Sequence, residues 1–260
     1  MITSTANAQM KHVVKLKKSA SYRRKHHEFL VEGIRMVQEI PPQYLKRLYV
    51  TEAFLARHEK LFADKSYEIV SEAVFKELSD TMTPQGVLAV ADCLSHSFEQ
   101  MLETGSDGGY PPALLLLENL QDPGNLGTIL RVAEGAGITG ILLSKDTVDI
   151  YNPKVVRSTM GSIFRIPFCV VDNLFEAVER LRDKKIRTCA AHLQGDNFYG
   201  MDFTKGVCIF IGNEGNGLTE ELTSLADNKV RIPMKGQVES LNAATAATVF
   251  SYEILRQRGG

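Results

Sequence analysis

The chain has 260 residues, of which 44% are hydrophobic and 23% charged, and its formal net charge is −1. This composition is typical of a globular protein with one large or two modest domains, and it excludes a low-complexity chain. No apolar run is long enough to cross a bilayer and no signal-peptide pattern opens the chain, so we expect a cytoplasmic protein. The four cysteines lie far apart without metal-ligand spacing, which predicts reduced core thiols and no metal site.

The first segment of the chain is strongly basic. Residues 1–27 contain no Asp or Glu, and residues 11–27 read KHVVKLKKSASYRRKHH. Such a cluster attracts polyanions whatever the overall charge, so we favour a nucleic-acid partner over the alternative of a solvated basic helix. The cations expected to bind RNA, including one from a following helix, are Lys15, Lys17, Lys18, Arg23, Arg24, Lys25 and Arg35.

From residue 28 to residue 92, short apolar runs alternate with helical patterns. The strand-like runs are FLVEG, RLYVTE, YEIVS and GVLAVAD, and GIRMVQEI, AFLARHEKLF and SEAVFKELS lie between them. This alternation predicts a small α/β domain that, with the basic segment, covers residues 1–97. Residues 98–112 end in a stretch rich in Gly and Pro, and we predict an interdomain linker there.

A second α/β series fills residues 113–260. Its strand candidates are ALLLLE, GILLS, RIPFCVV, IRTCAAH, VCIFIG and KVRIP. The helices between them are expected to begin near Asn125, Asn152, Asn173 and Leu218, with a last one from about Ser240. Nearly continuous apolar strands of this kind predict a parallel sheet covered on both faces, which binds ligands at the carboxyl ends of its strands. The loops at which we expect a ligand follow Leu117, Ala191, Ile211 and Ile232.

Residues 135–140 read GAGITG, which matches the G-x-G-x-x-G string of dinucleotide-binding proteins. In that role the string follows a strand and opens a helix. Here it follows the helical pattern NLGTILRVAEG and precedes the strand GILLS. We therefore interpret Gly135 and Gly137 as a helix C-terminus, where left-handed backbone favours glycine.

The first of three polar loops lies in residues 114–131, LLLLENLQDPGNLGTILR. Asn125 follows an Asp-Pro-Gly turn and is predicted to cap a helix. The apolar residues of that helix share one broad face, and Arg131 points away from it. In isolation, the simplest interpretation of Arg131 is a solvent-facing arginine.

The second loop lies in residues 209–222, IFIGNEGNGLTEEL. Three glycines in six positions allow a ligand to approach the backbone closely or allow positive φ angles. A phosphate-binding loop would carry Lys with Ser or Thr, whereas this loop carries Glu214. The loop therefore favours a neutral or cationic ligand over a triphosphate, and the alternative is a simple connecting turn.

The third loop runs from Pro233 to Glu239, and Ser240 is predicted to cap the helix that follows it. That helix is rich in alanine, and apolar side chains cover most of its circumference. Such a helix is predicted to be buried on two sides, against its own sheet and against a second subunit.

Together the three loops resemble the motifs of the SpoU (TrmH-like) class of SPOUT RNA ribose 2′-O-methyltransferases. The similarity covers residues 113–258. The residues that carry it are Asn125, Arg131 and Gly137 in the first motif, Gly212 to Gly217 in the second, and residues 232–234 with residues 240–242 in the third.

The N-terminal half also resembles a known module. KLKKSASYRRKHHEFLVEGIRMVQE and LSDTMTPQGVLAV are similar to the substrate-binding domain attached to many of these enzymes, a small α/β module related to ribosomal RNA-binding proteins. Because members that act on tRNA often lack this module, the resemblance favours 23S rRNA as the substrate. Transfer RNA remains the alternative substrate.

The resemblance implies a trefoil knot near the C-terminus, a homodimer with its site at the interface, and S-adenosylmethionine as cofactor. Asn125 would hold the reacting ribose or the cofactor loop, while Glu214, Ser240 and Asn242 would orient neighbouring groups. Arg131 would be the key catalytic residue. Since a guanidinium stays protonated, we expect it to bind a phosphate and stabilise developing alkoxide rather than act as a base. The cofactor would contact Leu193, Gly212, Asn213, Gly217, Ile232, Met234 and Leu241.

Two other classes of function compete with this prediction. One is a non-catalytic RNA-binding protein on the same fold, which the presence of every motif residue disfavours. The other is an unrelated nucleotide-dependent α/β enzyme, which is disfavoured by the reversed context of GAGITG and by the lack of a P-loop sequence.

Overall fold

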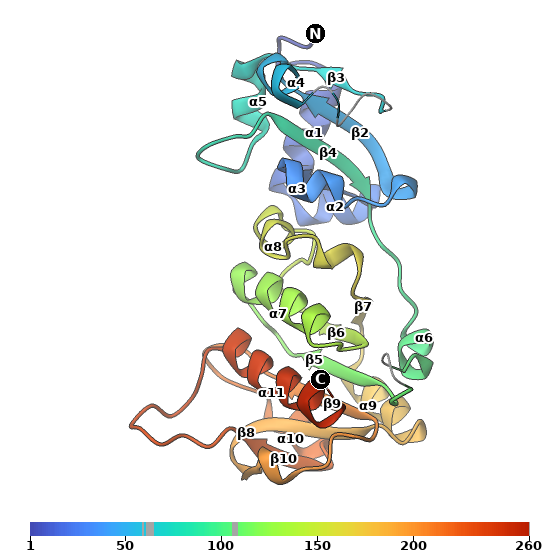
Figure 1. The fold of residues 1–260 in the computed structure, drawn as a ribbon, viewed down its shortest axis with the longest axis vertical. Coiled ribbons are helices and arrows are strands. Elements are labelled where there is room, and N and C mark those ends of the chain that lie inside the picture. Colours follow the sequence, from blue (N-terminus) through green and yellow to red (C-terminus); the bar gives the residue numbers. More distant parts are fainter. Residues whose placement is uncertain (59, 61–64, 106–108, 260) are drawn as a thin grey trace. The chain divides into compact units, whose positions relative to one another are not determined.

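The computed structural model describes residues 1–58, 60, 65–105 and 109–259. The chain forms two compact units. Unit 1 consists of Met1–Leu94 and Asp149–Phe164, and unit 2 consists of Ser95–Val148 and Arg165–Gly260. Both are α/β structures, as the alternating patterns predict (Figure 1).

Unit 1 is built on a four-stranded sheet in the order β1-β4-β2-β3. Strand β4 pairs antiparallel with both β1 and β2, and β3 pairs parallel with β2. The strands are β1 (Glu28–Glu32), β2 (Leu45–Val50), β3 (Glu68–Ile69) and β4 (Val87–Asp92). The helices are α1 (Ala8–Lys18), α2 (Ala20–His26), α3 (Ile34–Gln38), α4 (Glu52–His58) and α5 (Glu72–Leu78), with the 3₁₀ turn η1 (Pro42–Tyr44).

The core of unit 1 lies where α1 and α5 pack on the sheet. Met10, Val13 and Leu16 are fully buried, at three-residue intervals that place them on one face of α1. They contact Phe75 of α5 and Leu30 of β1 in one apolar cluster.

The segment Asp149–Phe164 belongs to unit 1, although the sequence predicts one continuous domain over residues 113–260. It contains α8 (Pro153–Ser158) and η3 (Ser162–Phe164). The hydroxyl of Tyr151 accepts a hydrogen bond from the Leu94 N–H at 2.7 Å and donates to its carbonyl at 3.0 Å. The Tyr151 ring also lies 4.7 Å from the ring of Phe29. These contacts could not be expected from a pattern of local periodicity.

Unit 2 is built on a six-stranded parallel sheet in the order β10-β8-β9-β5-β6-β7 (Figure 1). Every residue of the central strands β5, β6 and β9 is buried, which confirms the predicted parallel sheet with both faces covered. The strands are β5 (Ala113–Leu117), β6 (Gly140–Ser144), β7 (Phe168–Val171), β8 (Arg187–Asn197), β9 (Val207–Ile211) and β10 (Asn228–Arg231).

The helices of unit 2 cover the two faces of this sheet. Side chains of α6 (Phe98–Glu103), α9 (Leu174–Asp183) and α10 (Glu220–Leu225) share one apolar cluster with alternate residues of the central strands. Helices α7 (Pro123–Gly135) and α11 (Ala243–Gln257) pack against each other. A 3₁₀ turn, η4 (Phe198–Gly200), follows β8.

Helix α6 lies in the segment predicted to be a linker, residues 98–112. Phe98, Met101 and Leu102 of this helix are buried in the core cluster of unit 2. The structure therefore differs from the prediction over these residues, because the Gly- and Pro-rich composition that suggested a linker begins only after the helix.

Three helices begin at other residues than the sequence predicts, and one of them, α10, begins at Glu220 rather than at Leu218. Helix α7 begins at Pro123, and Asp122 rather than Asn125 caps it by accepting a hydrogen bond from the Asn125 N–H at 2.8 Å. Proline suits the first helical position because its φ is preset and its missing N–H would be unpaired anyway. Helix α11 is capped by Asn242 rather than Ser240, through the Ala244 and Thr245 N–H groups.

The interpretation of GAGITG is confirmed. Helix α7 ends at Gly135, and Gly137 has a φ of 71°, which is the left-handed conformation that a helix C-terminus favours. The string then leads into β6, so it opens no helix. Among the described residues, no helix is both long and apolar enough to span a membrane.

Candidate active site

The candidate site lies at the edge of the unit 2 sheet where the parallel strands end. Strands β10, β8, β9 and β5 are neighbours in that order, so the segments after their carboxyl ends also follow one another along this edge. The three polar loops predicted from the sequence follow β5, β9 and β10. The sheet order therefore brings three sequence motifs to one edge of one sheet.

The glycine-rich loop after β9 is tightly folded. Asn213 and Gly217 exchange two backbone hydrogen bonds of 3.0 and 2.9 Å, and the Asn213 side chain accepts hydrogen bonds from the N–H groups of Gly215 and Asn216. A Cβ atom on Gly212 would lie 2.1 Å from the carbonyl carbon of Gly217. Glycine at position 212 is thus required by the close approach of two backbone segments.

Glu214 connects this loop to the loop after β5. Its carboxylate accepts hydrogen bonds from the Gln121 N–H at 3.1 Å and the Asp122 N–H at 3.0 Å, and from the Asn125 side-chain amide at 3.0 Å. The Asn125 side-chain oxygen in turn accepts a hydrogen bond from Asn242 at 3.0 Å. A continuous chain of hydrogen bonds therefore joins all three motifs through Glu214, Asn125 and Asn242.

The electrostatic state of Glu214 follows from these contacts. Partial burial raises the pKa of its carboxyl, but the hydrogen bonds from Asn125 and from the Gln121 and Asp122 N–H groups outweigh that effect, and the net pKa is lowered. Glu214 is therefore an anion at neutral pH with its oxygens already engaged. Its arrangement suits a structural clamp better than a proton-transfer group.

Glu118 is a site residue that the sequence interpretation missed. It lies directly after β5, its side chain is almost fully buried, and its carboxylate accepts hydrogen bonds from the Thr219 N–H at 2.8 Å and hydroxyl at 2.7 Å. Thr219 caps α10, so Glu118 fixes the end of the glycine-rich loop against β5. The sequence did contain a signal for Glu118, namely a carboxylate that directly follows a run of four leucines.

Two predicted catalytic residues stand outside this network. Arg131 is exposed on α7, six residues and so about 9 Å along the helix from Asn125. Ser240 is exposed in the loop before α11. In the part of the chain that the structure describes, neither side chain makes a hydrogen bond or an ion pair.

Strand β8 contributes an apolar side chain to this edge of the unit 2 sheet. It pairs with β10 at Cys189 and Ala190 and again at Asp196 and Asn197, so the five residues between them form a bulge without partners in the ladder. Leu193 lies in this bulge with 58% of its surface exposed. An apolar side chain beside glycine-rich backbone suits a ligand with both an apolar ring system and hydrogen-bonding groups.

The residues predicted to bind the cofactor fit that description. Gly212 is buried and leaves no room for a side chain, Ile232, Met234 and Leu241 are half-buried, and they follow neighbouring strands or lead into α11. Among the described residues, no group of three or more His, Cys, Asp or Glu side chains could hold a metal ion.

The predicted RNA-binding cations divide into three groups. Lys15, Lys18, Arg24, Lys25 and Arg35 are exposed. Lys17 is half-buried, and its ammonium donates hydrogen bonds to the carbonyls of Glu77 and Ser79.

Arg23 corrects the prediction, because it is only 3% exposed. Its guanidinium donates two hydrogen bonds to Asp149, at 2.8 and 2.5 Å, and another to the Leu16 carbonyl. All of these partners lie inside unit 1, so Arg23 is a structural residue. A buried guanidinium needs such paired acceptors.

The four cysteines are free thiols. Burial raises the pKa of Cys93 and of Cys189 to about 12 and that of Cys169 to about 11, and it also raises the pKa of the fully buried Cys208. Thiols with such pKa values stay protonated, which disfavours a cysteine nucleophile.

Comparison with known proteins agrees with this geometry. Residues 112–252 match the SpoU rRNA Methylase family, and residues 7–89 match the MRM3-like substrate binding domain. The chain is 32% identical to the 23S rRNA (guanosine(2553)-2′-O)-methyltransferase RlmP of Bacillus subtilis over 97% of this chain and 98% of that one.

Solved structures show the same fold. The SpoU methyltransferase AviRb from Streptomyces viridochromogenes, in complex with the cofactor AdoMet, superposes with a TM-score of 0.84 at 29% identity and covers 97% of this chain and 98% of its own. A structure described as giving insights into 2-OH methylation of C/U34 on tRNA covers 64% of this chain and 100% of its own, with a TM-score of 0.52 at 28% identity.

The prediction from the three motifs is therefore confirmed at the level of the family. The matched region covers more than half of the chain and contains the whole hydrogen-bonded site of Glu214, Asn125 and Asn242. The chain belongs to the SpoU rRNA Methylase family, whose members are S-adenosylmethionine-dependent RNA ribose 2′-O-methyltransferases.

Proposed function

We propose that this protein methylates a ribose 2′-hydroxyl of 23S rRNA at the site around Glu214, and that it acts in the cytoplasm. The hydrogen-bond chain between the three motif loops is the observation that carries the proposal, because it holds the groups of a methyl-transfer site in one arrangement. The choice of rRNA rests on the match of residues 7–89 to a substrate-binding domain and on the relatives that cover the whole chain.

S-adenosylmethionine, when bound, supplies the electrophilic methyl group. Its adenine and methionine parts would be held by backbone groups around Gly212, Asn213 and Gly217 and by the side chains of Leu193, Ile232, Met234 and Leu241. Apolar and main-chain contacts of this kind fix a ligand without a charged pocket.

The remaining residues act on the RNA side of the site. Asn125 is held by Glu214 and Asn242, and it would position the ribose or the loop that carries the cofactor. Ser240, which is exposed in the loop before α11, would supply a further hydroxyl. Alignment of donor and acceptor accounts for much of the rate in such a transfer.

Arg131 is proposed as the catalytic residue. Its exposed guanidinium has no partner among the described residues, so its five N–H groups are available to RNA. It would bind the phosphate next to the reacting ribose and stabilise the negative charge that builds on the 2′-oxygen as its proton leaves.

We further propose that the enzyme is a homodimer with a knotted C-terminal region. Tyr252 is a large apolar side chain on α11, and 49% of its surface is exposed. Its exposure on a largely apolar helix supports a partner surface there. Sedimentation equilibrium of the full chain tests the dimer, and a monomer at micromolar concentration would contradict it.

The reaction is tested with S-adenosylmethionine that carries a labelled methyl group and with unmodified 23S rRNA and tRNA offered separately. The expected result is label in 23S rRNA at a phosphodiester that resists alkaline hydrolysis, since methylation blocks the 2′-hydroxyl. Label in tRNA alone would keep the chemistry and overturn the choice of substrate. Cofactor binding without label in either RNA would overturn both substrates.

A further inference from the structure

Unit 1 has a surface hollow that the proposed reaction does not use. It encloses about 260 Å³ and is lined by Ile34, Phe54, Arg57, His58, Pro84 and Gln85. This volume is somewhat below the range of roughly 300–1,000 Å³ that is usual for small-molecule sites, so it suits one planar ring system rather than a whole cofactor.

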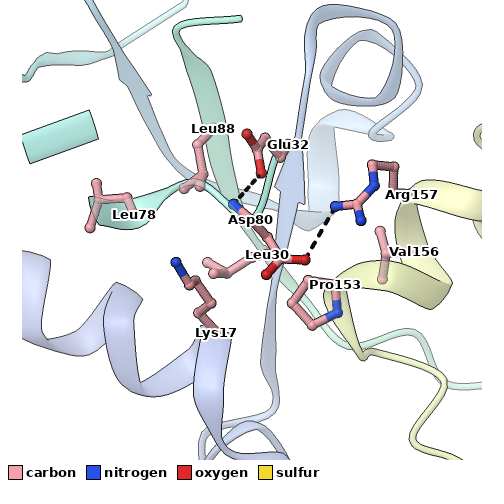
Figure 2. A pocket seen from close by; sticks show the side chains of 9 residues that line it. All are labelled: Lys17, Leu30, Glu32, Leu78, Asp80, Leu88, Pro153, Val156 and Arg157. Carbon is pink, nitrogen blue, oxygen red and sulfur yellow. Dashed lines mark hydrogen bonds and ion pairs between the residues drawn. The ribbon is translucent and has the colours of Figure 1, made fainter. Parts of the chain in front are cut away.

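A second pocket of unit 1 has no such room. It lies between Lys17, Glu32, Asp80 and Arg157 (Figure 2) and has space of about 10 Å³. That is about the space of one water molecule. Its charged side chains are also engaged with one another or with backbone, so it suits a structural role.

The lining of the larger hollow offers flat and apolar surfaces. Phe54 is 1% exposed and forms part of its floor. The His58 ring lies 4.7 Å from the Phe54 ring at an interplanar angle of 39°, and Pro84 contributes an exposed pyrrolidine ring. Planar rings next to an apolar floor favour a stacked aromatic ligand.

Two side chains add hydrogen-bonding groups to this surface. The side-chain oxygen of Gln85 accepts a hydrogen bond from the Ile34 N–H at 2.9 Å, which orients the amide and leaves its NH₂ without a partner among the described residues. Arg57 donates its Nε–H to the Ala53 carbonyl at 3.0 Å, and its other N–H groups are likewise unused within the described part of the chain.

The loop that carries Pro84 and Gln85 is anchored at its base. Glu32 accepts hydrogen bonds from the Ser79 hydroxyl, the Asp80 N–H and the Thr81 hydroxyl, and Asp80 pairs with Arg157 at 3.3 Å (Figure 2). This clamp restrains the loop before any ligand arrives, and a preorganised surface loses less entropy on binding.

We propose that this hollow is a subsite for one unpaired nucleobase of the RNA substrate. The base would stack on the His58 ring and the Arg57 guanidinium, and the Gln85 amide would donate to an acceptor on its edge. RNA-binding proteins recognise single-stranded segments in this way, by stacking bases on aromatic rings and arginine planes and by hydrogen bonds to base edges. The inference rests on the proposed function, because it takes RNA as the substrate.

The test uses the full chain and an unmodified 23S rRNA transcript at fixed pH over a series of salt concentrations. The dissociation constant for RNA is measured for the wild type, for His58→Ala and for Arg57→Ala, with S-adenosylmethionine binding as a second readout. Lys76→Ala is the matched control, because Lys76 is exposed on α5 and does not line the hollow. Each variant is first checked for an unchanged melting temperature.

The expected result for His58→Ala is RNA binding weakened about tenfold or more, with cofactor affinity and the salt dependence of RNA binding unchanged, because stacking releases no counterions. Arg57→Ala should also weaken RNA binding, because it removes the second surface on which the base would stack. Lys76→Ala should leave the RNA affinity within about twofold of the wild type.

The outcomes separate this proposal from the proposed reaction. If the wild type methylates rRNA while both hollow variants bind RNA as the wild type does, the subsite is overturned and the reaction stands. If the wild type binds 23S rRNA through Arg57 and His58 but transfers no methyl group, the reaction is overturned and the subsite stands. Absence of any RNA binding would overturn both.

Discussion

At the scale of single residues, some side chains of the site are hydrogen-bonded to one another, while others have no partner among the described residues. Asn125, Glu214 and Asn242 already satisfy one another, whereas Arg131 presents an unpartnered guanidinium in the described structure. Preorganised polar groups together with an available cation are what stabilisation of a developing negative charge requires.

Arg131→Ala is therefore expected to lower kcat at least about a hundredfold, because it removes donors that act on the transition state. The dissociation constant for S-adenosylmethionine, measured by calorimetry, should stay within about twofold of the wild-type value, since Arg131 makes no hydrogen bond or ion pair with a cofactor-binding loop among the described residues. Arg131→Lys keeps the charge but loses the planar fork, so its kcat should lie between those of the wild type and the alanine variant. Retained turnover in the alanine variant would remove Arg131 from its proposed role.

The lowered pKa of Glu214 predicts how the stability of the protein depends on pH. The hydrogen bonds from Asn125 and the backbone hold its folded pKa below 4.5, so its contribution to stability is present above pH 4.5 and is lost as the pH falls through the lowered value. Glu214→Gln should be less stable than the wild type to urea at pH 7, and this difference should shrink below pH 4.5. Glu239→Gln, in the exposed loop before α11, is the control and should leave the stability to urea unchanged both at pH 7 and below pH 4.5. A difference that is constant with pH would show that Glu214 is not ionised in the folded state.

At the scale of elements, α8 and its flanking turns hold unit 1 together from a distant part of the sequence. The Arg23 side chain is 4% exposed and that of Asp149 13%, so their ion pair is largely shielded from water. Removing one member of such a pair leaves a buried charge without compensation.

Asp149→Asn should therefore destabilise the protein by about 3–5 kcal/mol in urea unfolding. The matched control is Arg24→Ala, which removes an exposed cation from the same helix and should change stability by less than about 0.5 kcal/mol. Equal effects of the two substitutions would mean that the buried pair contributes little.

At the scale of the whole molecule, the boundary between the units is crossed more than once by the chain. Unit 1 takes Asp149–Phe164 from the middle of the sequence, so no cut near residue 97 separates two complete units. The segments of the two units consequently alternate along the chain.

A fragment of residues 1–97 should thus be less stable than unit 1 in the full chain. It lacks Asp149 and Tyr151, which removes the carboxylate that pairs with the Arg23 guanidinium and a ring that packs against Phe29. Hydrogen exchange of the β1 and β4 amides measures the difference directly. Equal protection in the fragment and in the full chain would show that the inserted segment is dispensable.

The sequence by itself determined the two α/β series, the positions of their strands along the chain and the three motif loops, because apolar periodicity, glycine and proline act locally. It also placed Asn125, Glu214 and Asn242 in one site, since they belong to motifs that end at the same edge of a parallel sheet. The sequence pattern did not show which of two neighbouring residues would cap α7. The structure shows that Asp122 rather than Asn125 does so.

The tertiary structure decided everything that depends on partners far away in the chain. Arg23 belongs to a dense basic run, but the carboxylate of Asp149, 126 residues later, makes it a buried structural residue. Glu118 ends a leucine run without any motif of its own, and only the position of Thr219, 101 residues later, reveals its function. Burial and charge pairing arise from contacts between distant segments, and no local pattern encodes which segments will meet.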